Sequence, residues 1–370
     1  MSENVLHAGS GFLRYVLGRL IRCDLMLVGL VMTLSTIGFI TLFSAGYSFP
    51  WRIEDQLRNI LVAGTVMVIF AIIPIRLLKK AALPIFIIGC LLLLATHFFG
   101  ITVKGATRWL NVGIRIQPSE IMKLSVPLML AWYYHVRGEH VAWFDHVAAL
   151  ALLAIPVGLI VKQPDLGTSI LVGIAGFSVI FFAGLNWKVI ATGIGTLLVS
   201  LPVIWNLLYD YQRERILTLI DPTNDPLGRG FHTLQSLIAI GSGGLFGKGW
   251  MEGTQAHLDF IPERTSDFLF AVYSEEFGFV GNLVLLVLYT LLIARSFQIA
   301  ASASSAFARL LSASIGVIFF TYTFVNMGMV SGILPVVGVP LPFMSYGGTA
   351  LLILGMCSGI LISVAIDSEA

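Results

Sequence analysis

The chain has 370 residues, of which 57% are hydrophobic and only 11% are charged, and its formal net charge is +2. Soluble domains carry roughly 25% charged residues, so this chain has too few charges to cover a water-facing surface. Most of its exterior must face lipid, which excludes an ordinary soluble enzyme. The small net charge says little about partners, and no nucleic-acid partner is expected.

The chain contains successive apolar runs close to the ~20 residues that a membrane-spanning helix needs. Ten such runs lie at about 25–45, 58–75, 81–100, 118–136, 146–161, 166–186, 188–207, 268–294, 308–329 and 346–366. They predict an all-α, polytopic membrane protein in which ten transmembrane helices form a single membrane domain over residues 1–370.

The placement of lysine and arginine orients these helices. Cations such as Arg76, Lys79 and Lys80 lie at helix ends with few acids nearby, whereas those on the other side are mixed with acids. The positive-inside rule therefore favours cytoplasmic termini. On this topology two segments lie outside the membrane, residues 101–117 and a long extracytoplasmic loop over residues 209–266. A loop of that length is expected to be functional.

Several motifs of soluble enzymes are absent. GSGGLFGKG has Ser242 and Gly249 where a phosphate-binding loop needs Gly and Ser or Thr, so flexible turn chemistry is the better interpretation. The seven histidines show no zinc spacing. No organic cofactor is expected.

QPSEIMKL places Glu120 and Lys123 three residues apart, on one face of a predicted membrane helix. Ionisable groups within a membrane are costly, which favours a functional role. The alternative is a neutralising pair that only supports packing.

Two aspartates precede apolar runs. Asp165 in QPDLGTS and Asp267 in PERTSDFLFAV each stand where a helix N-cap belongs. Capping is a complete local account of Asp165, and a role in substrate binding is equally open. For Asp267, capping of a helix that begins at Phe268 is the alternative to a role in chemistry.

Basic residues gather in both outer segments. They are Lys104, Arg108 and Arg115 in the shorter one, and Arg213, Arg215, Arg229, Lys248 and Arg264 in the longer one. Positive charge on this scale suits an anionic ligand at the membrane surface, most simply a phosphate or diphosphate. The alternative is a solvated loop balanced by its own acids. Residues 333–348, ILPVVGVPLPFMSYGG, predict broken backbone that lines a cavity.

Taken together, QPSEIMKL, QPDLGTS, DYQRERI, GSGGLFGKGW, PERTSDFLFAV and SGILPVVGVPLPFMSYGG closely resemble the SEDS family (shape, elongation, division and sporulation), in particular its RodA branch. The resemblance extends from about Asp24 to Ser363. It implies a peptidoglycan glycosyltransferase of the inner membrane that polymerises lipid II on the outer face during cell elongation and rod-shape maintenance. It also implies a class B penicillin-binding transpeptidase and other elongation-complex proteins as partners.

The resemblance places the family's essential acid at Asp267. Its other polar cavity residues fall on Arg108, Arg115, Glu120, Lys123 and Gln212. The residues themselves add Asp165, Lys248 and Arg264 as candidates for substrate binding. A carboxylate at the mouth of an apolar cavity can accept the acceptor hydroxyl's proton. Basic residues or a divalent cation, Mg or Mn, can stabilise the departing diphosphate; no metal ligands are identified.

Two other functions compete with the enzyme. Ten helices, intramembrane charges and Pro/Gly breaks also fit a lipid II flippase that works by alternating access. A non-catalytic scaffold for the transpeptidase is the third hypothesis. The enzyme is preferred because the polar residues gather on one predicted face of the membrane.

Overall fold

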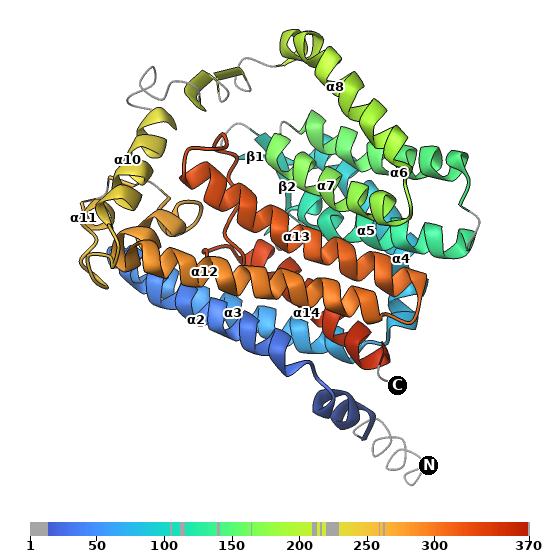
Figure 1. The fold of residues 1–370 in the computed structure, drawn as a ribbon, viewed down its shortest axis with the longest axis horizontal. Coiled ribbons are helices and arrows are strands. Elements are labelled where there is room, and N and C mark those ends of the chain that lie inside the picture. Colours follow the sequence, from blue (N-terminus) through green and yellow to red (C-terminus); the bar gives the residue numbers. More distant parts are fainter. Residues whose placement is uncertain are drawn as a thin grey trace.

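The computed structural model is a bundle of long helices (Figure 1). It describes residues 14–368 apart from 104–105, 112–114, 139–140, 164, 209–212, 215–216, 220–228, 259 and 262. A helical stretch over residues 14–21 precedes the bundle.

Each of the ten predicted apolar runs has a helix in the structure. These helices are α2 (Leu25–Ala45), α3 (Pro50–Ile72), α4 (Ile75–Phe99), α5 (Pro118–Arg137), α6 (Trp143–Lys162), α7 (Leu166–Phe182), α8 (Trp187–Leu207), α12 (Leu269–Ser302), α13 (Ala306–Val330) and α14 (Gly348–Ser368). Two further helices, α10 (Arg229–Ser242) and α11 (Thr254–His257), lie within the predicted long loop. α10 packs against α12 and α13, whereas α8 extends away from the main bundle (Figure 1).

Within the described residues, seven helices are long and apolar enough to cross a membrane: α2, α3, α4, α6, α12, α13 and α14. The other three predicted membrane helices, α5, α7 and α8, do not meet this criterion of length and apolar composition. α5 carries Glu120 and Lys123, α7 has only 17 residues, and the stretch of α8 whose side chains are described without a gap covers only Trp187–Val203.

The helices run alternately between two ends of the bundle. At the first, which we call the terminal end, Arg19 pairs with Asp367 at 2.7 Å and Arg295 pairs with Asp24 at 2.8 Å. These contacts bring the start of α2 and the ends of α12 and α14 together. The opposite end, called the cavity end, holds Asp267 and the starts of α5, α7, α12 and α14.

Close backbone approach joins α3 to α14. A Cβ on Gly355 would lie 2.6 Å from the carbonyl oxygen of Ala63, and one on Gly359 would lie 2.4 Å from that of Met67. This spacing is the small-xxx-small pattern that lets membrane helices pack closely. The two glycines therefore fix how α14 sits in the core.

α12 is interrupted at Gly278, whose φ of 67° is left-handed. The backbone of the preceding loop fits into the break: Phe279 N–H donates to the Gly244 carbonyl at 2.9 Å, and Val280 N–H donates to Leu245 at 3.0 Å. A Cβ on Gly278 would lie 2.2 Å from the Gly247 nitrogen. The GSGGLFGKGW turn is thus part of the α12 packing, in keeping with its glycine content.

The all-α prediction is wrong for the shorter outer segment. β1 (Ile101–Val103), β2 (Ala106–Asn111) and β3 (Arg115–Ile116) form a three-stranded antiparallel sheet in the order β1-β2-β3. The β-branched residues of ITV favour extended backbone, a signal that the search for long apolar runs does not register. The three cysteines, Cys23, Cys90 and Cys357, are free.

Candidate functional site

A polar cavity of about 180 Å³ opens at the cavity end. The start of α5, the start of α7, strand β2, the segment before α14 and the first turn of α14 line it. Its charged lining residues are Arg108, Glu120, Lys123 and Asp165. The Pro/Gly segment supplies Val337, Gly338, Val339 and Pro340. The structure therefore places the broken backbone of residues 333–348 at a cavity wall.

Asp267 lies against Gly338, one of the residues that line this cavity. Its Oδ2 atom is 3.4 Å from the position that a Cβ on Gly338 would occupy, and Gly338 has a left-handed φ of 75°. Asp267 is half-buried. Because glycine alone adopts that backbone without strain and has no side chain, the carboxylate approaches the cavity closely at this position.

Helix capping does not explain Asp267. The N-cap of α12 is Phe268, one residue later, and no side-chain hydrogen bond caps that helix. The alternative that Asp267 is an N-cap is therefore wrong.

Asn326 of α13 holds Asp267 against the cavity wall. Its Nδ2 donates to the Asp267 carbonyl oxygen at 2.9 Å and to the Val339 carbonyl oxygen at 2.7 Å. Asn326 is fully buried, and its Oδ1 has no hydrogen-bond partner among the described residues. One amide thus fixes the backbone of Asp267 relative to the segment that lines the cavity.

Glu120 and Lys123 form a buried pair on α5. Lys123 Nζ donates to Glu120 Oε1 at 2.5 Å and to the Tyr322 hydroxyl at 2.5 Å. The other carboxylate oxygen, Glu120 Oε2, is buried without a hydrogen-bond partner in the part of the chain that the structure describes. Leaving a buried acceptor unsatisfied costs about 1–3 kcal/mol. A ligand that donates to this oxygen in the cavity would recover that cost.

Asp165 combines two roles that the sequence left open. One oxygen caps α7 by accepting from the Thr168 N–H at 3.2 Å, while the other accepts from Arg108 Nη1 and Gln117 Nε2, each at 3.2 Å. Arg108 keeps 31% of its side chain exposed. Asp165 therefore ties strand β2 and α5 to α7 and directs Arg108 along the cavity.

Two further predicted residues, Lys248 and Arg264, do not line this cavity. Lys248 Nζ instead contacts Glu275 Oε1 at 2.6 Å, and buried Arg264 donates to the Ala45 carbonyl oxygen at 2.7 Å. Both contacts join loop to helix. The side chain of Arg115 and the whole of Gln212 lie outside the described part of the chain, so their roles in binding stay predictions, as do those of Lys248 and Arg264.

Among the described residues that line it, the cavity has no excess of positive charge. Arg108 and Lys123 are balanced by Asp165 and Glu120, and Asp267 adds a further carboxylate at the wall. Among the described residues no three His, Cys, Asp or Glu side chains lie close enough to hold a metal ion. Mg²⁺ is commonly bound by one or two carboxylates together with substrate phosphates. The donor set therefore fits a cation that arrives with a diphosphate, with Asp267 as a candidate carboxylate ligand.

The sequence analysis missed Asn326 and Tyr322, which lie in an apolar run, FFTYTFVNMGMV. The cost of polar groups inside a membrane, which singled out Glu120, applies equally to Asn326. An amide side chain within a largely apolar run was therefore the feature of the sequence that could have identified Asn326.

Comparison with known proteins places this arrangement in a family. The family model described as a cell cycle protein, FtsW/RodA/SpoVE, matches residues 17–370. The peptidoglycan glycosyltransferase MrdB of Escherichia coli is 45% identical over 346 residues, which cover 93% of this chain and 94% of MrdB. A probable peptidoglycan glycosyltransferase FtsW of Geobacter metallireducens is 33% identical over 360 residues, 93% of this chain and 95% of the relative.

Two solved structures are also similar. A chain from work on the structural coordination of polymerization and crosslinking by a peptidoglycan synthase complex has a TM-score of 0.82 and 31% identity, covering 94% of this chain and 98% of that one. The crystal structure of the rod shape determining protein RodA of Thermus thermophilus has a TM-score of 0.71 and 29% identity, with 94% and 98% covered. The chain belongs to the FtsW/RodA/SpoVE family of cell cycle proteins.

Proposed function

We propose that this chain is a peptidoglycan glycosyltransferase that polymerises lipid II during cell elongation. The observation that carries the proposal is the position of the Asp267 carboxylate at Gly338, on the wall of the polar cavity. The names of the relatives, peptidoglycan glycosyltransferase MrdB above all, support the same activity.

Glycosyl transfer from a lipid diphosphate needs a base for the acceptor hydroxyl and stabilisation for the leaving diphosphate. Asp267 takes the proton from the acceptor sugar hydroxyl while that oxygen attacks the anomeric carbon of the lipid-linked donor. Arg108 and Lys123 contact the diphosphate, and Glu120 orients Lys123 through its 2.5 Å contact. A divalent cation, Mg or Mn, would supply further charge stabilisation to the leaving group.

The flippase alternative requires a path between the two ends of the bundle. Midway along α13 and α14, Phe319, Cys357 and Leu361 are fully buried in apolar packing. An enzyme that works at one face needs no such path. This packing favours the glycosyltransferase over the transporter.

The proposed topology has ten membrane helices, with α5, α7 and α8 added to the seven long apolar ones. Both termini lie in the cytoplasm, and the active site and the loop over residues 209–266 lie outside. On a cysteine-free background, Lys80→Cys and Glu252→Cys test this topology, because both positions are exposed. A membrane-impermeant thiol reagent should label only position 252 in intact cells. Labelling of position 80 alone would reverse the orientation.

A class B penicillin-binding transpeptidase is proposed as the partner, together with other elongation-complex proteins. The pairing of polymerization with crosslinking in the related synthase complex supports a crosslinking partner.

The test of the activity is direct. The purified chain and its transpeptidase partner are given fluorescent lipid II, and the products are separated on a gel. A ladder of glycan strands is expected from the wild type but not from Asp267→Asn. Absence of polymer from the intact complex, together with transport of labelled lipid II across vesicle membranes, would instead identify a flippase.

A further inference from the structure

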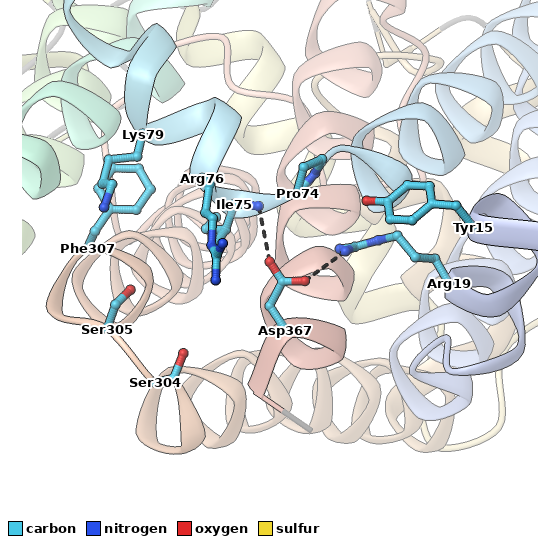
Figure 2. A pocket seen from close by; sticks show the side chains of 10 residues that line it. All are labelled: Tyr15, Arg19, Pro74, Ile75, Arg76, Lys79, Ser304, Ser305, Phe307 and Asp367. Atoms are coloured by element: carbon cyan, nitrogen blue, oxygen red, sulfur yellow. Dashed lines mark hydrogen bonds and ion pairs between the residues drawn. The ribbon is translucent and has the colours of Figure 1, made fainter. Parts of the chain in front are cut away.

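A second cavity, of about 750 Å³, lies at the terminal end of the bundle. The helical stretch over residues 14–21, the α3–α4 junction, the α12–α13 turn and the last turn of α14 surround it (Figure 2). The 21 residues of α14 separate it from the polar cavity, a length of about 30 Å at 1.5 Å per residue. It therefore has no part in the chemistry proposed for Asp267.

One wall of this terminal cavity is fixed by charges that already satisfy each other. Arg19 Nη1 donates to Asp367 Oδ1 at 2.7 Å, its Nη2 donates to Ser363 Oγ at 2.9 Å and its Nε donates to the Ala71 carbonyl oxygen at 3.1 Å. The other oxygen of Asp367 accepts from the Ile75 N–H at 3.2 Å. These contacts hold α3, α4 and α14 together and neutralise one positive and one negative charge.

Two further cations line the cavity without an acidic partner in the described residues. Arg76 makes no hydrogen bond or ion pair within that part of the chain, and Figure 2 shows its side chain extending from the start of α4 toward the α12–α13 turn. Lys79 Nζ lies 3.1 Å from His135 Nε2, which accepts from the ammonium and leaves its remaining protons available. Within the described residues the cavity thus presents an uncompensated charge of about +2, from one guanidinium and one ammonium.

The N-terminus of α13 faces the same space through Ser304, Ser305 and Phe307. Ser305 caps the helix by accepting from the Ala308 N–H at 3.2 Å. The first N–H groups of a helix have no intrahelical acceptor, and the helix dipole places partial positive charge there. This helix end adds to the attraction that Arg76 and Lys79 exert on an anion.

The surroundings indicate which anion. The cavity lies at the end of the bundle where several of the long apolar helices end, which on the proposed topology is the level of the lipid headgroups. Exposed apolar residues neighbour its lining residues along the chain: Leu77, next to Arg76, is 54% exposed, and Ile21, two residues after Arg19, is 82% exposed. Basic pockets between membrane helices at this level bind anionic lipid headgroups. We propose that the terminal cavity binds the phosphodiester headgroup of an anionic phospholipid, with Arg76 and Lys79 on the phosphate and the acyl chains along the apolar rim.

The proposal is tested by lipid binding to the purified full-length chain in detergent, followed by native mass spectrometry. Short-chain phosphatidylglycerol is compared with phosphatidylcholine of the same chain length and with deacylated glycerophosphoglycerol. Each cation near an anionic headgroup contributes roughly fivefold in affinity. The double variant Arg76→Gln, Lys79→Gln should therefore lose about 25-fold in affinity for phosphatidylglycerol.

Lys80→Gln is the matched control, because Lys80 is an exposed neighbour on α4 that does not line the cavity. It should bind phosphatidylglycerol like the wild type. Arg76→Gln alone breaks no described protein contact, so it should fold normally and still lose about fivefold.

Three outcomes would overturn the proposal. Equal affinity of Arg76→Gln and the wild type for phosphatidylglycerol would show that the headgroup binds elsewhere. Equal binding of glycerophosphoglycerol and phosphatidylglycerol would assign the cavity to a soluble phosphate ester. Absence of preference for phosphatidylglycerol over phosphatidylcholine, with Arg76-dependent binding of a polyglutamate peptide, would assign it to an acidic protein segment.

Discussion

Two buried carboxylate–lysine pairs in this protein have nearly the same geometry and different surroundings. Glu120 and Lys123 meet at 2.5 Å on α5, whereas Glu275 of α12 and Lys248 of the preceding loop meet at 2.6 Å. Both glutamates are buried. By distance and burial alone, the two pairs would be assigned the same role.

The two pairs differ in the other hydrogen bonds that their glutamates accept. Glu275 Oε1 also accepts from the Thr254 hydroxyl at 3.1 Å, and both of its oxygens accept from the Gln255 N–H at 3.2 Å. Glu120 Oε2 has no partner in the described residues and belongs to a residue that lines the polar cavity. A carboxylate saturated by protein donors joins two segments of the fold. A carboxylate that lines a cavity and has an oxygen without a protein donor can accept from a ligand. We therefore expect a structural role for the Glu275–Lys248 pair and a functional role for the Glu120–Lys123 pair.

The largest loss of polymerisation rate is expected from a change at Asp267, which lies beside the polar cavity that Glu120 and Lys123 line. Asp267→Asn preserves size but cannot accept the proton, and loss of a general base alone lowers the rate by about 10²–10⁴. The measurement is the polymerisation rate from lipid II at matched protein level, with partner binding checked by co-purification. Glu263→Gln, at an exposed acid four residues earlier, is the control and should polymerise normally. Near wild-type polymer from Asp267→Asn would remove the catalytic assignment.

The next largest losses of polymerisation activity are expected from Glu120→Ala and Lys123→Ala. Each leaves its partner as an uncompensated charge in a buried site, which costs roughly 3–5 kcal/mol. We expect each single variant to insert in the membrane and to lose polymerisation by about 10² or more. Membrane fractionation and the gel assay measure the two properties separately. A Glu120→Ala, Lys123→Ala double variant with near-normal activity would reduce the pair to packing.

A smaller loss is expected from Asn326→Ala. The change removes both hydrogen bonds that hold the Asp267 backbone to Val339, and misplacement of a catalytic group by about 1 Å can lower a rate by up to ~10². Because anchoring is only loosened, we expect a reduction of about tenfold. Thr323→Val on the same helix is the control, since the Thr323 hydroxyl donates only to the helix carbonyl of Phe319. Equal rates for both variants would show that Asn326 does not position Asp267.

The apolar pattern predicted the helices well because the bilayer fixes their length and composition. The boundaries differ where polar residues extend a helix beyond its apolar run. α3 begins at Pro50 although the run was placed from residue 58, because Arg52, Glu54 and Asp55 belong to the helix. α12 continues to Ser302 for the same kind of reason.

The site was predicted where its chemistry is local in sequence. Glu120 and Lys123 are one helical turn apart, and Asp165 caps the helix that follows it. Contacts between distant residues gave no such signal. Lys248 meets Glu275 from 27 positions away, and Asn326 reaches Asp267 from 59 positions away. Lys248, which the sequence predicted to bind phosphate, therefore has the buried acid Glu275 as its partner in the structure.

The smallest loss of polymerisation rate is expected from a change at Glu275, the partner of Lys248. Glu275→Gln keeps the size of the side chain but removes the charge that Lys248 contacts, while Lys248, with 28% of its side chain exposed, can still reach water. We expect a loss of roughly 1–3 kcal/mol in the free energy of unfolding, measured as a lower midpoint of thermal unfolding in detergent. The polymerisation rate per folded molecule should fall by no more than about twofold, since no described contact of Glu275 reaches the polar cavity. Glu120→Gln should differ by lowering the polymerisation rate by about 10² or more, because Glu120 lines the polar cavity and its loss leaves buried Lys123 without a partner acid. A Glu275→Gln variant that unfolds like the wild type but polymerises tenfold more slowly would contradict the structural role and return Lys248 to the substrate-binding residues.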